Sequence, residues 1–386
     1  MLLLRSHDPS REYMQIGFRE IISNYDPDSP LAEASTPPSA WYTDLRILAL
    51  EQHTVFSQAW QLAGRADQVR NPGQYITTEV AGEGILVVRG NDNVLRGFFN
   101  VCRHHAAAVM TKSEGKAENL RCPYHGWTYD LEGKLILTPE FAGVANFDRN
   151  ANGLVPVQTA EWLGWVFAKL NTGGPTLKEY LANDLIERLN LEQLSWFERR
   201  SYFLNCNWKV FVDNYLDGGY HVPHIHGGLS SVLDNSKYKI ETGERFCLQT
   251  SPIAAGQGEA QTAAVRKGEL ARYFWIYPNL MINIYDEVMD TNLVIPRGVD
   301  KTEVIFDYYF ADVSEPAREK NLASITVSEQ IQSEDIAICE SVQCGLNSRA
   351  YDSGRLSVRR EAGEHLFHRL LYADLITGLS DEETTI

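Results

Sequence analysis

The chain carries Cys102-Arg103-His104 and, after seventeen further residues, Cys122-Pro123-Tyr124-His125. Each of these two half-sites offers one cysteine thiolate and one histidine imidazole. Two thiolates suit one ferric ion and two imidazoles suit a neighbouring one, which is the ligand set of a Rieske [2Fe-2S] centre. We therefore expect Cys102, His104, Cys122 and His125 to bind such a cluster.

A structural zinc ion is the competing interpretation, because two cysteines and two histidines also satisfy tetrahedral zinc. Zinc fingers, however, pair cysteine with cysteine and histidine with histidine along the chain. Here each half-site contains one of each, and the second is followed by Gly126-Trp127. This order favours the iron–sulfur cluster.

Length and composition predict a two-domain protein of a reducing compartment such as the cytoplasm. The 386 residues, 44% of them hydrophobic, exceed one average domain and can bury a sizeable core. The net charge of −16 argues against nucleic acid or an anionic membrane as the main partner. Neither a membrane-spanning apolar run nor a signal peptide is expected. Six cysteines are too few for a disulfide framework, which indicates a reducing compartment.

Short strand-like runs dominate residues 60–172. Runs on either side of turn sequences predict β-hairpins at 84–99 and 127–137, and a last strand is expected at 164–170. Both half-sites fall on turns of this small, all-β, mostly antiparallel domain.

The remaining residues predict an α+β domain with an N-terminal extension. Residues 1–59 indicate an arm and then a helix, from Asp44 to Trp60, that packs on the second domain at 173–386. That domain contains four strand candidates before a long helix at 317–345, and the strands lie at 274–277, 280–285, 292–295 and 304–310. An antiparallel sheet gripping this helix is the expected arrangement.

A second cluster of histidines, His221, His224 and His226, follows a helical pattern. If the helix runs as far as Pro223, then Asp213, Asp217 and His221 share one face.

Two histidines here need a third ligand from elsewhere, and Asp335 on the long helix is the candidate. Two histidines and one carboxylate form the facial triad of non-haem iron(II). A histidine-rich loop without metal and simple surface acids are the alternatives.

Four motifs together resemble the α subunits of Rieske non-haem iron oxygenases, and most of all the plant-type choline monooxygenases. They are residues 100–106, 122–127, 207–226 and 334–343. The resemblance implies an all-β Rieske domain, a helix-grip catalytic domain, and mononuclear iron held by His221, His226 and Asp335. His224 stands where a non-ligand residue is expected.

The resemblance also implies a carboxylate that links the iron to a cluster in the adjacent subunit of a homotrimer. Many family members carry it three residues before the first iron histidine, where this chain has Gly218. Asp217, four residues before, is therefore the predicted electron-transfer bridge, with a simple surface acid as the alternative.

No dinucleotide fingerprint is evident, so a separate ferredoxin or ferredoxin reductase is the expected electron donor. Basic residues near the half-sites predict a docking face for an acidic ferredoxin, although a solvated loop with incidental charge explains them equally well. They are Arg96, Arg103, Lys112, Lys116 and Arg121.

The predicted reaction is hydroxylation with dioxygen of choline to betaine aldehyde, for glycine betaine synthesis. A carnitine-like or other N-methylated or carboxylated compound, or an aromatic acid, is the alternative substrate, and a non-enzymatic electron carrier is a remote one. Aromatic side chains able to hold a quaternary ammonium group lie in the strand-rich half. They are Phe203, Trp275, Tyr277, Tyr285, Phe306, Tyr308 and Phe310.

Overall fold

A computed structural model describes residues 17–181, 191–254 and 260–383, so the first sixteen residues of the predicted arm lie outside the described residues. Two compact units make up the chain: Met1–Glu51 with Leu194–Ile386, and Gln52–Gln193. The predicted domain boundaries, at 59/60 and 172/173, stay a prediction. Within the described residues, no helix is long and apolar enough to cross a membrane.

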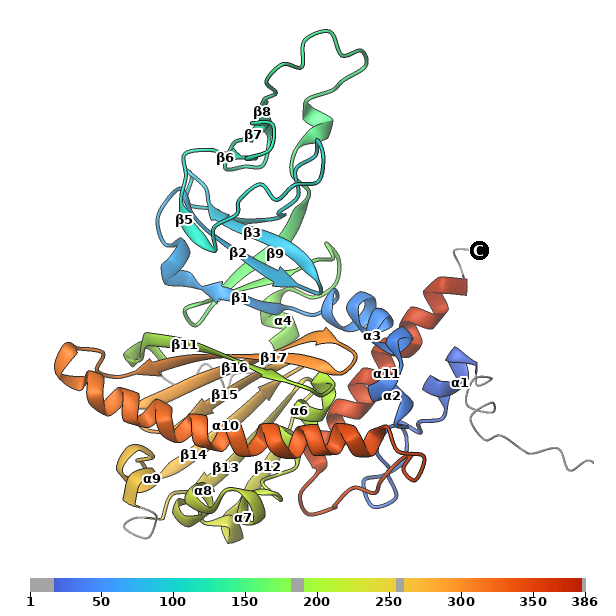
Figure 1. Ribbon diagram of the computed structural model, residues 1–386, viewed down its shortest axis with the longest axis vertical. Helices are drawn as coiled ribbons and strands as arrows, with labels where there is room; N and C mark the ends of the chain where they lie inside the picture. The colour runs from blue at the N-terminus through green and yellow to red at the C-terminus, as the bar shows by residue number, and fades with distance from the viewer. Residues whose placement is uncertain (1–16, 182–190, 255–259, 384–386) are drawn as a thin grey trace, which may run out of the picture. The chain divides into compact units, whose positions relative to one another are not determined.

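The unit from Gln52 to Gln193 is built on a seven-stranded antiparallel sheet in the order β1-β10-β9-β4-β3-β2-β5, with a three-stranded sheet β6-β7-β8 (Figure 1). Its strands are β1 (Gln61–Arg65), β2 (Gln74–Val80), β3 (Glu83–Arg89), β4 (Leu95–Phe99), β5 (Glu114–Lys116), β6 (Leu120–Arg121), β7 (Thr128–Tyr129), β8 (Leu135–Leu137), β9 (Pro156–Trp162) and β10 (Trp165–Lys169). The hairpins β3–β4 and β7–β8 confirm both predicted pairs. A short helix, α4 (Leu177–Leu181), follows β10.

The other unit contains a second seven-stranded antiparallel sheet, in the order β11-β17-β16-β15-β14-β13-β12. Its strands are β11 (Ser195–Leu204), β12 (Lys239–Thr242), β13 (Phe246–Pro252), β14 (Leu270–Ile276), β15 (Leu280–Ile284), β16 (Val288–Gly298) and β17 (Lys301–Phe310). The long helix α10 (Arg318–Leu346) runs across this sheet (Figure 1). This arrangement confirms the predicted α+β fold.

Shorter helices complete this unit. They are α1 (Phe18–Ser23), α2 (Ala40–Thr43), α3 (Leu45–Glu51), α6 (Trp208–Leu216), α7 (Val222–Ile225), α8 (Gly227–Val232), α9 (Ala260–Val265) and α11 (Ala362–Glu383). The helix expected from Asp44 to Trp60 is α-helical only as far as Glu51, and a π-helical turn (Gln52–Phe56) follows it.

A buried ion pair fastens α3 to α6. Lys209 Nζ lies 2.6 Å from Glu51 Oε1, and both side chains are fully enclosed at 0% exposure. The indole Nε1 of Trp208 donates to the other carboxylate oxygen of Glu51 at 2.8 Å. Burial raises the pKa of Glu51 and lowers that of Lys209, so each charge depends on its partner.

We expect Glu51→Ala to lower the free energy of unfolding by about 3–5 kcal/mol, because it leaves the Lys209 ammonium buried without its partner. Urea unfolding followed by tryptophan fluorescence measures the change. The control is the double variant Glu51→Leu with Lys209→Met, which removes both charges and should recover most of the loss. A cost of less than about 1 kcal/mol for Glu51→Ala would contradict the expectation.

Candidate metal centres

The two predicted cluster half-sites fold into turns of the same kind. In each, the cysteine N–H donates to the carbonyl oxygen five residues later, at 2.8 Å for Cys102 and 2.9 Å for Cys122. Each cysteine carbonyl accepts the N–H four residues later, where φ is positive: +59° at Ala106 and +73° at Gly126. The chain thus builds two matched loops, each with one cysteine and one histidine.

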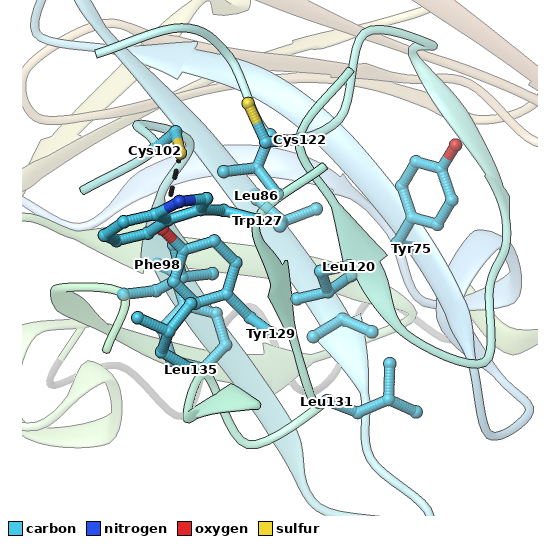
Figure 2. Close-up of a cluster of buried hydrophobic side chains, with 13 residues drawn as sticks. Tyr75, Leu86, Phe98, Cys102, Leu120, Cys122, Trp127, Tyr129, Leu131 and Leu135 are labelled. Atoms are coloured by element: carbon cyan, nitrogen blue, oxygen red, sulfur yellow. Dashed lines mark hydrogen bonds between the residues drawn. The ribbon is translucent and has the colours of Figure 1, made fainter. Parts of the chain in front are cut away.

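The four predicted cluster ligands lie close to one another. The rings of His104 and His125 are 4.8 Å apart between centroids, and both cysteines belong to one buried core (Figure 2). His104 stacks on Trp127 at 4.6 Å. Among the described residues, the buried Nδ1 of His104 has no hydrogen-bond partner, which is costly unless it binds a metal. This donor set fits a Rieske cluster.

Hydrogen-bonding groups surround the two cysteine sulfurs. The Tyr129 hydroxyl lies 3.4 Å from Cys102 Sγ (Figure 2). It also accepts the N–H of Arg103 at 3.0 Å. Burial raises the pKa of the Cys122 thiol, and hydrogen bonds from the backbone of Tyr124 and His125 partly offset this. Hydrogen bonds to cluster sulfurs are one means by which a protein sets the reduction potential.

The histidine-rich segment departs from its predicted helix. That helix was expected to continue to Pro223, but α6 ends at Leu216. Gly218 and Gly219 follow with φ of +69° and +65°, which favours glycine. A Cβ at position 218 would also lie only 2.1 Å from the carbonyl oxygen of Arg360. The prediction that Asp213, Asp217 and His221 share one face of a helix is therefore wrong.

The turn nevertheless brings Asp217 to His221. Asp217 Oδ2 accepts the backbone N–H of His221 at 2.9 Å and lies 2.6 Å from its Nδ1. Asp213 instead accepts a hydrogen bond from Tyr42 at 2.7 Å and lies 3.0 Å from His368 Nε2. Asp213 thus belongs to a different cluster.

The three predicted iron ligands converge from the two ends of α7, where His221 precedes the helix and His226 follows it, and from α10. The two Nε2 atoms of His221 and His226 are 3.1 Å apart. Asp335 Oδ1 lies 3.0 Å from the Nε2 of His226 and 3.7 Å from that of His221. This set could hold a metal ion, whereas His224 is exposed on α7 and lies outside it.

Other side chains orient these three. Glu334 Oε2 lies 2.7 Å from His226 Nδ1, and Asp217 Oδ2 lies 2.6 Å from His221 Nδ1. The side chain of Asn214 donates to Asp335 Oδ1 at 2.8 Å. Metal-binding histidines commonly have the second ring nitrogen held in this way. Sequence reasoning missed Asn214 and the contact of Glu334.

The electrostatics of the three groups favour a bound cation. Burial lowers the pKa of His226, but its hydrogen bonds and attraction to the Asp335 and Glu334 carboxylates outweigh burial and raise it overall. Two facing imidazole nitrogens and a carboxylate present lone pairs that a metal ion satisfies together. The donors fit a two-histidine, one-carboxylate iron site.

A cavity opens onto these three side chains. Of the seven aromatic residues predicted from the sequence, only Tyr285 and Phe306 line it. Phe203 is exposed, and the other four are buried in the core. Lining residues that sequence reasoning missed are Tyr215, Tyr238, Tyr273, Gln249, Arg266 and Asp290.

Comparisons with known proteins agree with this geometry. The Rieske [2Fe-2S] domain family matches residues 59–148, and the ring hydroxylating alpha subunit (catalytic domain) family matches residues 191–377. A choline monooxygenase, chloroplastic, of Arabidopsis thaliana is 37% identical over 384 residues, covering 96% of this chain and 90% of that protein. The chain belongs to the Rieske non-haem iron oxygenase α subunits.

Other Rieske oxygenases show similar coverage. The carnitine monooxygenase oxygenase subunit of Escherichia coli (strain K12) is 32% identical, covering 91% of this chain and 98% of that one. A quaternary ammonium Rieske monooxygenase in complex with L-carnitine superimposes with a TM-score of 0.77 at 29% identity, covering 90% of this chain and 97% of that one.

The cofactors of this Rieske oxygenase are a [2Fe-2S] cluster and a mononuclear non-haem iron. When bound, they supply single electrons and activate dioxygen for oxidation of a substrate. The chain itself would orient the donor atoms through Asp217, Glu334 and Asn214.

We expect the two metal sites to be separable by mutation. Asp335→Ala should remove the mononuclear iron and leave the electron paramagnetic resonance signal of the reduced Rieske cluster intact, because the two donor sets share no residue. Cys122→Ser should abolish that signal. Metal analysis of anaerobically purified protein, together with the spectrum, checks both expectations. Zinc alone in the wild-type protein, or loss of the cluster signal in Asp335→Ala, would contradict them.

Proposed function

We propose that this Rieske oxygenase hydroxylates a small quaternary ammonium compound, using dioxygen and electrons from a separate protein. The observation that carries the proposal is the cavity at His221, His226 and Asp335, since several aromatic side chains line it. They are Phe211, Tyr215, Tyr238, Tyr273, Tyr285 and Phe306. Aromatic faces attract quaternary ammonium groups. The names of the choline and carnitine monooxygenases among its relatives support the same class.

Two substrates within this class are candidates. Choline, oxidised to betaine aldehyde for glycine betaine synthesis, is supported by the likeness to choline monooxygenases over most of the chain. A carboxylated compound of the carnitine type is favoured by a charged side chain of the cavity, Arg266. A location in the cytoplasm or chloroplast stroma belongs to the same proposal.

Electrons would reach the iron across a subunit boundary in a homotrimer, with Asp217 as the bridge. Asp217 is suited to this role because its carboxylate is fixed on His221, and Oδ1 also accepts the N–H of Tyr220 at 3.1 Å. A closed ring of head-to-tail subunits is the assembly that repeats such a contact.

The proposed donor is an acidic ferredoxin with its reductase. Exposed basic side chains near the cluster loops, Arg103, Lys112, Lys116 and Arg121, support docking of such a protein.

Asp217→Asn should slow electron transfer per bound iron, with about 10- to 100-fold lower turnover. The experiment follows cluster oxidation after mixing pre-reduced trimer with substrate and dioxygen, and sedimentation measures the assembly.

Glu334→Gln is the matched control, because Glu334 holds the other histidine. It should weaken iron binding, yet leave the transfer rate per bound iron unchanged. A fully active monomer, or a normal transfer rate in Asp217→Asn, would rule out the bridge.

The aromatic cavity should distinguish a cation from its neutral counterpart. We expect 3,3-dimethylbutanol, the uncharged analogue of choline, to bind at least about tenfold more weakly, because a desolvated cation–π contact contributes about 2 kcal/mol. Calorimetric titration of the anaerobic holoenzyme with both compounds measures this ratio. Equal affinity would contradict the cation site, and product from benzoate alone would indicate an aromatic acid as substrate.

A further inference from the structure

Arg266 is a buried cation in the wall of the substrate cavity. It follows α9 directly and is 3% exposed. Its Nη1 donates to Ser324 Oγ at 2.8 Å and its Nη2 to Ser328 Oγ at 2.5 Å, both on α10. The guanidinium carbon lies 4.8 Å from the ring centroid of Tyr285. The guanidinium is therefore held in a fixed orientation by neutral groups.

Within the described part of the chain, this cation has no direct counter-ion. Among residues 17–181, 191–254 and 260–383, no carboxylate lies within 4.0 Å of its guanidinium nitrogens. Its buried Nε also has no hydrogen-bond partner in those residues. A buried arginine is normally paired, and an unpaired buried donor is costly. An anion entering the cavity would supply the direct counter-ion that the described residues do not provide.

The same cavity contains a buried acid, Asp290, on β16. Its Oδ1 accepts hydrogen bonds from the amides of Asn283 at 2.8 Å and Asn292 at 2.7 Å. Burial raises the pKa of Asp290, and the charge of Arg266 lowers it only in part. A cationic group in the cavity would hold this carboxylate ionised.

The spacing along α10 between the serine that holds Arg266 and the iron ligand Asp335 suits a small elongated molecule. Ser328, which holds Arg266, and Asp335 are seven residues apart on α10. That separation corresponds to about 10 Å of helix rise. A trimethylammonium group and a carboxylate joined by a few carbons fit within this length.

We infer that the preferred substrate is a zwitterion whose carboxylate binds Arg266 and whose quaternary ammonium group binds near Asp290 and the cavity tyrosines. This inference rests on the proposed function and narrows it to carboxylated compounds. Choline, which has a hydroxyl in place of the carboxylate, leaves Arg266 without a counter-ion.

The test compares two compounds that differ only at one end, 4-(trimethylammonio)butanoate and 4-(trimethylammonio)butan-1-ol. Both are titrated calorimetrically into the anaerobic holoenzyme. The carboxylate compound should bind at least about tenfold more tightly than the alcohol, as expected for charge-assisted hydrogen bonds in a buried site. In Arg266→Gln this preference should disappear through loss of carboxylate affinity, while the alcohol binds within about twofold of wild type.

Two further variants distinguish a role of Arg266 in ligand binding from a structural role, because Arg266 also joins the end of α9 to α10. Arg266→Lys keeps the charge and should retain part of the preference. Lys267→Gln removes an exposed neighbouring charge and should retain all of it. If Arg266 had only a structural role, substituting it would lower the affinity for both compounds equally and would also lower the melting temperature. That result would overturn the inference.

The wild-type comparison needs no variant and distinguishes the two proposals. Equal affinity for the acid and the alcohol would overturn the inference of a zwitterionic substrate, but it would not contradict the proposal of a quaternary ammonium substrate. The isostere 5,5-dimethylhexanoate keeps the carboxylate and has an uncharged tert-butyl group in place of the trimethylammonium group, so it tests the other end of the molecule. If it binds as tightly as the trimethylammonium acid, both the proposed function and the zwitterion are overturned.

Discussion

The orientation of two imidazole rings is the constraint on which the candidate iron site depends. His221 and His226 bring their Nε2 atoms within 3.1 Å because a carboxylate holds each Nδ1, from Asp217 in one ring and Glu334 in the other. A ring that rotated would lose its carboxylate and turn its donor atom away from Asp335. Such fixed second contacts determine both the tautomer and the direction of a ligating histidine.

Helix α10 connects this centre to the rest of the cavity. Ser324, Ser328, Gln332 and Asp335 recur at spacings of four, four and three residues, so they lie on one helix face. One end of this face supplies the carboxylate of the iron site, and the other holds the guanidinium of Arg266. A single helix thus sets the spacing between the candidate iron site and the charged side chain of Arg266 in the cavity. Loops would fix such a spacing less accurately.

Two pairs of buried, oppositely charged side chains have different roles in this protein. Glu51 and Lys209 touch at 2.6 Å in the core, so their charges are satisfied within the fold. Arg266 and Asp290 line one cavity without forming an ion pair within the described chain. The first pair is closed to ligands, and removing either partner alone would destabilise the fold. The second presents separated charges of both signs to whatever enters, which suits a dipolar ligand.

By itself the sequence determined the features that depend on local spacing: the two cysteine–histidine loops, the hairpins, the long helix and the histidine pair. The long helix offered Asp335 as a candidate third ligand, but only the resemblance of its motif assigned it that role, because no local pattern links it to His221. Tertiary structure alone decided where α6 ends, since Gly218 meets Arg360 from 142 residues away. It alone also selected Arg266 for the cavity, because a pocket wall is assembled from side chains of several strands and helices, and which of them face inward depends on packing across the whole sheet.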